Sequence, residues 1–481
     1  MKLLSILSKL GIICLLIAQF SCRKDFDTIV SNGNLNFSVD TLFLDTVFNN
    51  LSTRTNILTV YNRSNNDILI PKIQFAKSDS KYRMNVDGVS GTTFEDVLLL
   101  QKDSIFIFVE ATVDASDTND EMLYQDQILF DPNGNQQDVD LITVVKDATF
   151  LFSTSGTDFE LTTSLFTNTK PYVIYGNAIV PENGSLTIEA GSTLHFHENA
   201  SLTISKGATL NIEGTLTDSI VFKGDNLSYI YDQVPGQWDG IILKENSTAN
   251  IHYLKILNPT TGIEIVNNNT IDIQNTEIYN AATYSIAGEN ANLTASNLVL
   301  GQAGKSNLIL QGGTYTFNHA TLANYWSKGV RFQENVVVSN YKTNETNEVI
   351  ETPLNQANFN NCIISGNRTT EILIDKKEDF SIFNIHFKNC LLDLEEGDDF
   401  YNTDDTNIYT DVLLNKNKDF RNTSINDLRI GLENEGIDQA DATIARAIPT
   451  DILGTDRTVA PDIGAYQHID FKTLEPTKED E

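Results

Sequence analysis

The sequence predicts an all-β chain, in which an N-terminal β-sandwich is followed by a right-handed parallel β-helix. Three observations predict it: short runs that alternate apolar and polar residues, many turn-forming Gly, Asn, Thr and Asp residues, and an internal repeat in the second half. Alternation with a period of two is typical of half-buried strands, and a short internal repeat is typical of a solenoid. With 481 residues, 40% of them hydrophobic, the chain is long enough for several domains with their own cores.

Residues 1–21 are predicted to be a signal peptide. Lys2 and Lys9 precede a short apolar stretch, and the small residue Ser21 stands directly before Cys22. No later segment approaches the roughly 18 consecutive apolar residues of a transmembrane helix. The junction of Ser21 and Cys22 resembles the lipobox of bacterial lipoproteins, which implies that Cys22 carries the lipid and becomes the mature N-terminus. The alternative is ordinary cleavage that leaves Cys22 free.

Residues 22–34 are predicted to be a tether. The charged run Arg23–Asp27 resembles the short signals that send lipoproteins of the Bacteroidetes to the outer face of the outer membrane. This resemblance implies a protein that is lipid-anchored to the outer membrane and exposed at the cell surface.

Residues 35–150 are predicted to form the sandwich. Apolar and polar residues alternate in 35–39, 56–61 and 104–109, and turn-forming residues separate these runs, as expected of half-buried antiparallel strands. The stretches FSVDTLFLDTVF, MNVDGVSG and DSIFIFVEATVD resemble an immunoglobulin-like module found near the anchor of many Bacteroidetes surface lipoproteins. The resemblance implies a spacer.

The internal repeat predicts the β-helix over residues 151–412. The phrase SLTI at Ser185–Ile188 returns sixteen residues later at Ser201–Ile204, and seven of the fourteen aligned positions are identical. We expect each such unit to be one coil that buries its apolar side by stacking on the next. Looser copies follow at roughly twenty-residue intervals, as is usual for solenoid repeats. The asparagines Asn258, Asn280 and Asn318 precede the expected corners, where left-handed backbone suits Asn.

Three phrases resemble right-handed parallel β-helix proteins: Gln237–Ile241, Phe359–Cys362 and the ending Pro461–Gln467. The ending resembles the DIGAYE-type terminus of β-helix proteins with a choice-of-anchor Q domain, although Gln467 replaces the usual Glu. Since a solenoid must cover its last apolar layer, residues 413–470 are predicted to be a terminal coil and cap. Residues 471–481 are predicted to be a charged, solvated tail.

Cys362 and Cys390 occur in the same local phrase, Asn-Cys followed by two aliphatic residues. This predicts equivalent places on nearby coils, where the two thiols are buried and stacked. A single disulfide remains the alternative, because an exported protein meets an oxidising compartment.

The formal net charge of −32 is spread along the chain, and there is no run of Lys or Arg. Such a charge repels nucleic-acid phosphates and anionic headgroups, so nucleic acid is excluded as a partner. The same charge, with a domain at one end and a cap at the other, disfavours end-to-end association of the sheets. We therefore expect a monomer.

Three residues are candidates to face a ligand: His195, His197 and Asp239. The two histidines flank Phe196, which points inward, so they share an outward face and could hold a metal or act as acid and base. Solvated histidines on an outer sheet are the alternative. Asp239 lies in the corner phrase Gln237–Ile241, where a structural role is the alternative. No catalytic residue and no metal ligand is assigned.

No cofactor is expected, with calcium left as an open alternative. The acidic loop at 395–405 could hold it loosely, but a solvated loop explains the same residues. Asp131–Asn135 imitates the start of an EF-hand loop without its later ligands, so it is predicted to be a hairpin turn.

The sequence favours a non-enzymatic surface or periplasmic lipoprotein that presents a β-helix to an extracellular glycan or protein. The alternative, implied by the β-helix resemblance, is a polysaccharide lyase or glycoside hydrolase that acts on a face of the helix. Two carboxylates flanking a glycosidic bond would then stand about 5 to 9.5 Å apart, which requires outward positions one or two coils apart.

Overall fold

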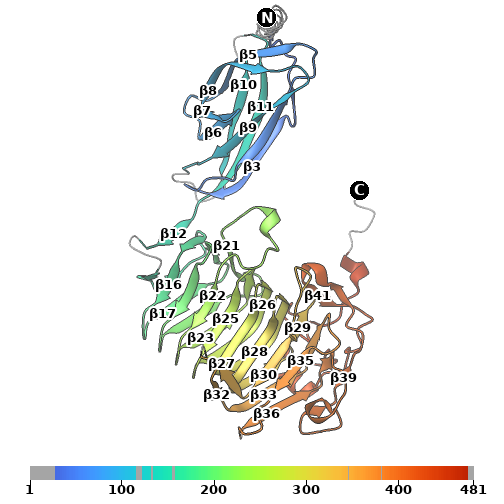
Figure 1. The fold of residues 1–481 in the computed structure, drawn as a ribbon. Helices are drawn as coiled ribbons and strands as arrows, with labels where there is room; N and C mark the ends of the chain where they lie inside the picture. The colour runs from blue at the N-terminus through green and yellow to red at the C-terminus, as the bar shows by residue number, and fades with distance from the viewer. Residues whose placement is uncertain are drawn as a thin grey trace, which may run out of the picture. The chain divides into compact units, whose positions relative to one another are not determined.

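A computed structural model describes residues 28–114, 122–131, 134–153, 158–344, 346–380 and 382–474. The chain divides into two compact units, residues 1–146 and 147–481, and each is described here by itself (Figure 1). The predicted signal peptide and residues 22–27 of the predicted tether, Cys22 among them, lie outside the described residues. Within the described ranges, no helix is both long and apolar enough to cross a bilayer.

The first unit consists of two β-sheets that enclose one hydrophobic core. The six-stranded sheet contains β1 (Thr28–Val30), β5 (Asp67–Phe75), β10 (Met122–Phe130), β11 (Gln137–Lys146), β3 (Thr41–Phe48) and β8 (Thr93–Leu99). The five-stranded sheet contains β2 (Asn36–Phe37), β4 (Asn56–Tyr61), β9 (Ser104–Ala111), β6 (Tyr82–Val86) and β7 (Val89–Gly91). Alternate residues of each strand point into the core, as the period-two pattern predicts. Strand β1, which falls in the predicted tether, pairs in parallel with β5.

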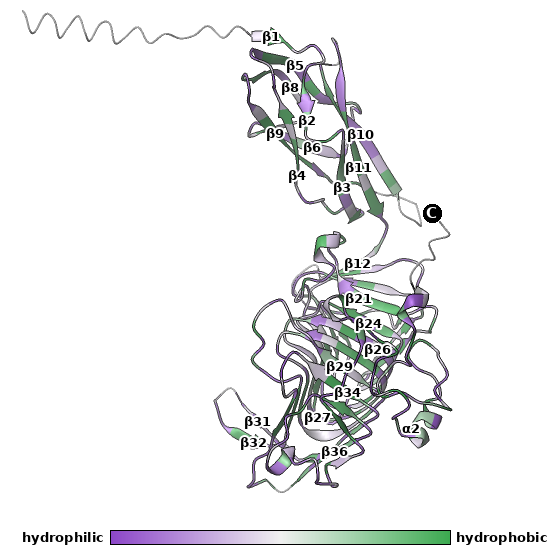
Figure 2. Cartoon of the chain, turned by 90° about the vertical axis from the view of Figure 1, so that its right-hand side faces the viewer, coloured by the Kyte–Doolittle hydropathy of each residue, from purple (hydrophilic) through white to green (hydrophobic). Residues whose placement is uncertain are grey.

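The second unit is a parallel β-helix, as the sequence predicts. From β12 (Thr149–Phe152) to β23 (Thr248–His252), each strand pairs with the strand three places further along the chain, so one coil contains three strands and the unit has three faces. Further along, some strands continue through a corner and belong to two faces. Face I contains β12 (Thr149–Phe152), β15 (Tyr172–Tyr175), β18 (Thr193–Phe196), β21 (Ile220–Gly224), β24 (Leu254–Leu257), parts of β26 (Thr270–Ala281) and β27 (Tyr284–Ala303), β29 (Thr321–Asn324), β34 (Ile363–Gly366), β37 (Leu391–Leu392) and β39 (Leu413–Leu414). Figure 2 shows β21, β24, β26, β29 and β34 in this order along the face.

The other two faces are built in the same way. Face II contains β13 (Asp158–Glu160), β16 (Asn177–Val180), β19 (Ser201–Ile204), β22 (Gly240–Leu243), β25 (Thr261–Val266), parts of β27 and β28 (Ser306–Asn318), β30 (Val336–Ser339) and β35 (Ile372–Asp375). Face III contains β14 (Leu165–Phe166), β17 (Ser185–Glu189), β20 (Thr209–Glu213), β23 (Thr248–His252), parts of β26, β27 and β28, β33 (Leu354–Asn360), β36 (Phe383–Lys388) and β38 (Tyr409–Thr410).

The sixteen-residue repeat is not one coil, and this prediction was wrong. Ser185 pairs with Thr209, twenty-four residues away, whereas Ser201 pairs with Asn177. The two copies of SLTI therefore lie on different faces, III and II. All three faces bury alternate side chains in one shared core, so the same strand-and-corner phrase recurs about every eight residues on successive faces. Sixteen residues span two of these phrases, and a coil needs three.

Side chains inside the helix form ladders of like residues. Phe317, Phe359, Phe387 and Tyr409 stack on successive coils of face III, with ring centroids 5.0, 5.0 and 5.4 Å apart and planes within 14° of parallel. This spacing follows from the strand separation of about 4.8 Å. Cys362 and Cys390 are both free and buried, and the backbone N–H of Cys362 lies 3.4 Å from Cys390 Sγ. The prediction of stacked thiols is confirmed.

Left-handed residues turn the chain between face III and face I. Asn275, Asn297, His319, Asn361 and Asn389 occupy this corner on successive coils, with φ between 48° and 55°. Their side chains bond from coil to coil: Asn297 Nδ2 donates to Asn275 Oδ1 at 2.8 Å, and Asn361 Nδ2 donates to His319 Nε2 at 2.9 Å.

The expected corner asparagines are only partly in these places. Asn258 and Asn280 do form a ladder, at the corner between faces I and II, where Asn280 Nδ2 donates to Asn258 Oδ1 at 3.0 Å. Asn318 instead lies on face III and accepts a hydrogen bond from Asn360 Nδ2 at 3.0 Å. The corner residue on that coil is His319, one place later.

His319 is fully buried, and its two ring nitrogens are both bonded: Nε2 accepts from Asn361, and Nδ1 lies 3.2 Å from the Gly464 carbonyl. Burial, reinforced by the nearby charge of Arg457, lowers the pKa of His319 well below its usual range. The folded chain therefore holds His319 neutral, while the unfolded chain binds a proton there below about pH 6.5. The stabilisation is complete above that pH and is lost as the pH falls.

We predict that His319→Asn reduces acid sensitivity. Asparagine occupies the equivalent corner at Asn275 and Asn361, so the variant should fold and keep the coil-to-coil bond. Between pH 7 and pH 5 the wild-type chain should lose up to about 1.4 kcal/mol per pH unit more than the variant. Urea unfolding at several pH values checks this. Equal pH slopes in the two proteins would contradict it.

Residues 413–470 were predicted to be a terminal coil and cap. Residues 413–414 form the last strand, β39, but the residues that follow, 415–474, do not cover the end of the helix. They return along the outside of face I, where Leu428, Ile430, Ile463 and Ala465 pack on outward side chains of that face, among them Tyr279, Val299, Ile363 and Leu391. Figure 2 shows α2 (Ala442–Ala447), which belongs to this segment, beside the rungs of face I. The register gives the reason: from β26 onward the outward positions of face I include the apolar residues Tyr279, Val299, Ala323, Ile363 and Leu391, which need a cover.

The end of the helix is covered by the acidic loop instead. Phe400 and Tyr401, in the short 3-10 turn Asp399–Tyr401, pack against the core of the helix together with Val412 and Leu414. Tyr409 Oη donates to the Phe400 carbonyl at 2.7 Å. The loop thus combines an exposed acidic exterior with an aromatic interior.

The ending Pro461–Gln467 clamps the C-terminal segment onto face I. Asp462 is fully buried and accepts hydrogen bonds from the backbone of Asp438 and His468. The backbone N–H of Ala465 donates to Thr321 Oγ1 at 2.9 Å. In this chain Pro461–Gln467 therefore has a structural role, which is to hold the C-terminal segment against face I.

Candidate functional site

The three outward faces of the helix differ in what they offer a ligand. The C-terminal segment covers much of face I. Face III is mostly polar: after Leu165 on β14, its central outward column contains Thr187, Asn211, Asn250, Asp272, Thr294, Thr316, Asn358 and His386. Several of these side chains already bond to one another, as Asn250 Nδ2 does to Asn211 Oδ1 at 2.9 Å. From β17 onward this column of face III is therefore regular and polar.

Face II combines an apolar and a polar column. The first column contains Ile179, Thr203, Ile242, Glu264, Ala287, Ile309, Val337 and Leu373 in register. Beside it runs the second column, Val266, Glu289, Gln311, Ser339 and Asp375. Binding sites for small molecules and sugars commonly pair an apolar surface with a few polar groups that orient the ligand.

A groove of about 530 Å³ lies on the N-terminal half of face II. It is lined by Asn177, Ile179, Glu182, Thr203, Ser205, Lys206, Ile242, Lys244, Glu245, Val266 and Asn267. Lys206 Nζ and Glu245 Oε1 form an ion pair of 2.6 Å, and both are about half exposed. Ser201 and Thr203 both donate to Asn177 Oδ1 at 2.7 Å, which fixes the amide at the edge of the groove.

Further along face II, long connections stand on both sides of β30. The segment 325–335 precedes β30 and presents Val330 and Phe332 to solvent. The hairpin of β31 (Tyr341–Thr343) and β32 (Val349–Glu351) follows it. Two residues of β31 contact the polar column. Lys342 forms an ion pair with Glu289, and Tyr341 Oη donates a hydrogen bond to Asp375 Oδ2 at 2.5 Å. Burial together with Asp375 raises the pKa of Tyr341 to about 12, so its hydroxyl stays protonated.

Face II also brings two carboxylates near one another. Glu264 is exposed, and Glu289 lies on the next coil in the neighbouring column. The two residues are therefore diagonal neighbours on adjacent strands of face II. The sequence analysis missed this pair, because the two residues are separated by 25 positions and neither stands in a recognisable phrase. Only the register of β25 with β27, in which Glu264 pairs with Ala287 and Val266 with Glu289, reveals it.

The predicted ligand-facing residues do not form one site. His195 is buried, and its Nδ1 lies 3.1 Å from the Gly224 carbonyl, so the expectation of two outward histidines is wrong for this one. His197 is exposed, lies 2.8 Å from Asp225 Oδ2, and packs against the ring of Tyr175 with centroids 4.4 Å apart. Strand β18 ends at Phe196, so His197 lies in the corner that follows and not on the strand.

Asp239 is exposed and directly precedes β22 of face II. Partial burial raises the pKa of its carboxyl above the usual value. Its neighbour Trp238 is fully buried, stacks on Phe196 at 4.2 Å, and donates Nε1–H to the Leu257 carbonyl at 2.9 Å. The phrase Gln237–Ile241 is thus a packed corner beside the face that carries the groove.

No group of three or more His, Cys, Asp or Glu side chains within the described residues comes together in a way that could hold a metal ion. The EF-hand-like stretch Asp131–Asn135 lies partly outside those residues. In the acidic loop, Asp405 Oδ1 accepts hydrogen bonds from the backbone and side chain of Asn407.

Comparison with known proteins places the helix among pectate-lyase-like folds. Residues 159–265 match the model of the pectate-lyase-like β-helix domain. No curated protein sequence matches the chain. One similar solved structure is the catalytic domain of a GH87 α-1,3-glucanase with nigerose, at 12% identity and a TM-score of 0.19, which covers 70% of this chain and 80% of that one.

Two further structures resemble a smaller part. A family 123 glycoside hydrolase from Clostridium perfringens shows 7% identity and a TM-score of 0.18, over 23% of this chain. The E. coli chaperone DraB shows 13% identity and a TM-score of 0.18, over 25% of this chain. The chain spans 26% and 58% of these two proteins. What the chain has in common with known families is therefore the pectate-lyase-like β-helix over residues 159–265.

Proposed function

We propose that this chain is a non-enzymatic lipoprotein whose β-helix binds an extracellular glycan along the groove of face II. The observation that carries the proposal is the groove itself, in which the apolar residues Ile179 and Ile242 lie beside amide, hydroxyl and charged groups. Sugar rings present apolar C–H faces and hydroxyl edges, and such a lining suits both. The lipid at Cys22 would hold the protein on the outer membrane, facing the surroundings, with the first unit as a spacer.

The charges of the groove favour a neutral glycan. Lys206 and Lys244 are balanced by Glu182 and Glu245, and the chain as a whole carries −32. A polymer of uronic acids would be repelled over most of the surface. The coil spacing of about 4.8 Å places outward side chains at regular intervals along the axis, which suits a repetitive ligand. A protein partner with an extended segment is the alternative occupant.

The test uses the soluble chain without residues 1–22 and a panel of neutral and acidic polysaccharides, with and without calcium. Ile242→Lys places a long charged side chain on the floor of the groove. We expect it to weaken binding at least about tenfold, which corresponds to about 1.4 kcal/mol. Thr294→Lys is the matched control, because Thr294 is an exposed outward residue at the centre of a rung on face III. No binding by any glycan, or equal loss in both variants, would contradict the proposal.

Catalysis is the second candidate, and the pair of Glu264 and Glu289 favours it. Glu289 forms an ion pair with Lys342, while Glu264 is exposed. Assays for new reducing ends and for unsaturated products on the same polysaccharides decide between the two functions. We expect binding without turnover. Turnover that disappears in Glu264→Gln, with binding retained, would make the chain a glycoside hydrolase.

A further inference from the structure

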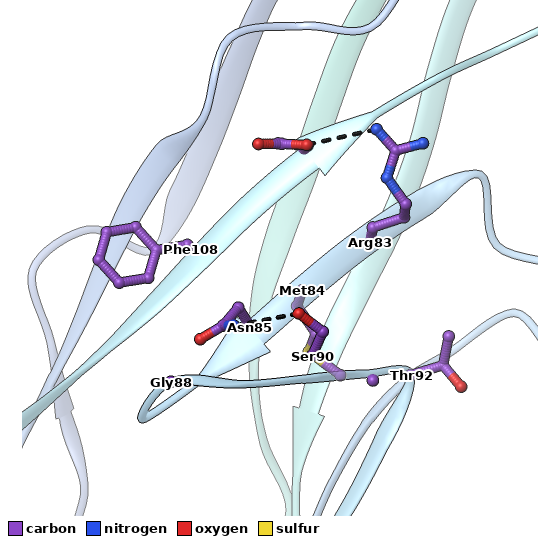
Figure 3. A pocket seen from close by; sticks show the side chains of 9 residues that line it. Arg83, Met84, Asn85, Gly88, Ser90, Thr92 and Phe108 are labelled. Carbon is purple, nitrogen blue, oxygen red and sulfur yellow. Dashed lines mark hydrogen bonds and ion pairs between the residues drawn. The ribbon is translucent and has the colours of Figure 1, made fainter.

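The first unit carries its own pocket, of about 770 Å³, on the outer surface of the five-stranded sheet. It lies where the β6–β7 hairpin meets β9, and the side chains that line it include Arg83, Asn85, Ser90, Thr92, Phe108 and Glu110. Figure 3 shows Phe108 on one side, Arg83 on the other, and the bonded pair of Asn85 and Ser90 between them. The volume is in the range typical of small-molecule sites.

The register of the sheet produces this arrangement. Ser90 pairs with Asn85, and Asn85 pairs with Phe108, so the three outward side chains form one row across β7, β6 and β9. Arg83 and Glu110 form the next row and are joined by an ion pair of 3.3 Å. An aromatic ring with 38% of its surface exposed therefore stands beside an amide, a hydroxyl and a balanced pair of charges.

One polar atom in this row has no partner. Asn85 Nδ2 donates to Ser90 Oγ at 3.1 Å, while Asn85 Oδ1 is buried and accepts no hydrogen bond from the described residues. If the Asn85 amide were flipped, its oxygen would accept from Ser90 and its nitrogen would become the atom without a hydrogen-bond partner. A buried polar atom without a partner costs roughly 1–3 kcal/mol, and native structures contain few of them. Because Asn85 lines the pocket, a rotation of its amide toward the pocket would let a ligand hydroxyl donate to Oδ1.

We propose that this pocket binds a single neutral sugar unit, so that the first unit is a glycan-binding module as well as a spacer. A sugar hydroxyl donates to Asn85 Oδ1, an apolar ring face packs on Phe108, and further hydroxyls exchange hydrogen bonds with Glu110 and Arg83. Because Arg83 and Glu110 neutralise one another, the pocket does not favour a charged ligand. The aromatic face disfavours a small inorganic ion, since a π surface attracts polarised C–H groups. This site is independent of the groove on face II.

The experiment is saturation-transfer NMR on the soluble full chain without residues 1–22, with glucose, galactose, mannose, N-acetylglucosamine and their disaccharides as probes. Phe108→Ala should abolish the transfer or weaken binding at least about tenfold. Phe106→Ala is the matched control, because Phe106 is 51% exposed on the same strand but does not line the pocket. Asn85→Ala removes the acceptor and should also weaken binding, with the fold retained.

The outcomes of this NMR experiment test the pocket of the first unit independently of the groove on face II. Binding that is lost in Phe108→Ala and kept in Phe106→Ala and Ile242→Lys supports the pocket, whatever the polysaccharide panel shows. No transfer to any probe, or equal loss in the two phenylalanine variants, overturns it. Displacement of every bound sugar by an unrelated apolar peptide also overturns it, because the pocket would then be a protein-docking site.

Discussion

Replacing Arg331 by methionine should destabilise the β-helix by about 3–5 kcal/mol, because it leaves a buried carboxylate without its counter-charge. The Arg331 side chain is 2% exposed and that of Glu371 is fully buried. Arg331 donates to both carboxylate oxygens, at 2.5 and 2.8 Å, and to Asn367 Oδ1 at 2.8 Å. Both tryptophans of the chain, Trp238 and Trp326, lie in the second unit, so their fluorescence during urea unfolding reports on the helix.

The loss in Arg331→Met should be smaller at pH 5 than at pH 7. Burial raises the pKa of Glu371 above its usual value, and Arg331 opposes that rise. Without Arg331 the pKa of Glu371 rises further, so the folded variant binds a proton more tightly than the unfolded chain. Its stability then falls as the pH rises through the usual range of a glutamate towards the raised folded value.

The double variant Arg331→Met with Glu371→Leu is the control. It removes both charges, and buried ion pairs replaced by apolar residues often cost little. We expect it to recover most of the stability that the single variant loses. A single variant that loses less than about 1 kcal/mol, or a loss that does not depend on pH, would contradict the assignment of a critical buried pair.

Replacing Gly464 by valine should release the C-terminal segment from face I and cost about 3 kcal/mol or more. Gly464 has φ of 105°, a region that side chains avoid. A Cβ there would lie 2.8 Å from Ile363 Cδ1 and 2.9 Å from Thr321 Oγ1. The backbone would have to retreat from face I, which breaks the bond between Ala465 and Thr321 and exposes apolar side chains. Faster cleavage within residues 415–474 by limited proteolysis checks this.

Gly191→Val is the matched control for backbone strain alone. Gly191 has φ of 79°, and the nearest atoms to an added Cβ lie at 3.5 to 3.8 Å, which is ordinary contact. We expect a cost of about 1–3 kcal/mol without faster cleavage of the C-terminal segment. Equal effects of the two valine substitutions would show that crowding against face I is unimportant.

The fold class followed from the sequence because strands are local. Alternation of apolar and polar residues places one side of each strand in a core, and the repeated SLTI and TL phrases identify a solenoid. The number of residues in a coil could not be predicted from the sequence. All three faces bury the same kind of side chain, so the apolar pattern recurs at every strand and cannot show how many strands close a coil. The pairing of Ser185 with Thr209 answers that question.

The sequence also could not show which residues of the candidate site lie close together in space. His195 and His197 are two residues apart and were expected to share a face, but the strand ends at Phe196 and the corner separates them. Glu264 and Glu289 are far apart in the sequence, and only the stacking of coils brings them together. The register that pairs Glu264 with Ala287 and Val266 with Glu289 reveals the pair.

By itself the sequence determined the all-β character, the presence of a β-helix, the stacked thiols of Cys362 and Cys390, and the importance of the ending Pro461–Gln467. These are consequences of local alternation, repetition and short phrases. The tertiary structure alone decided the three-strand coil, the return of residues 415–474 over face I, and the groove on face II. Each of these depends on which distant strands come into register, and that is set by the closure of one shared core, which no single segment encodes.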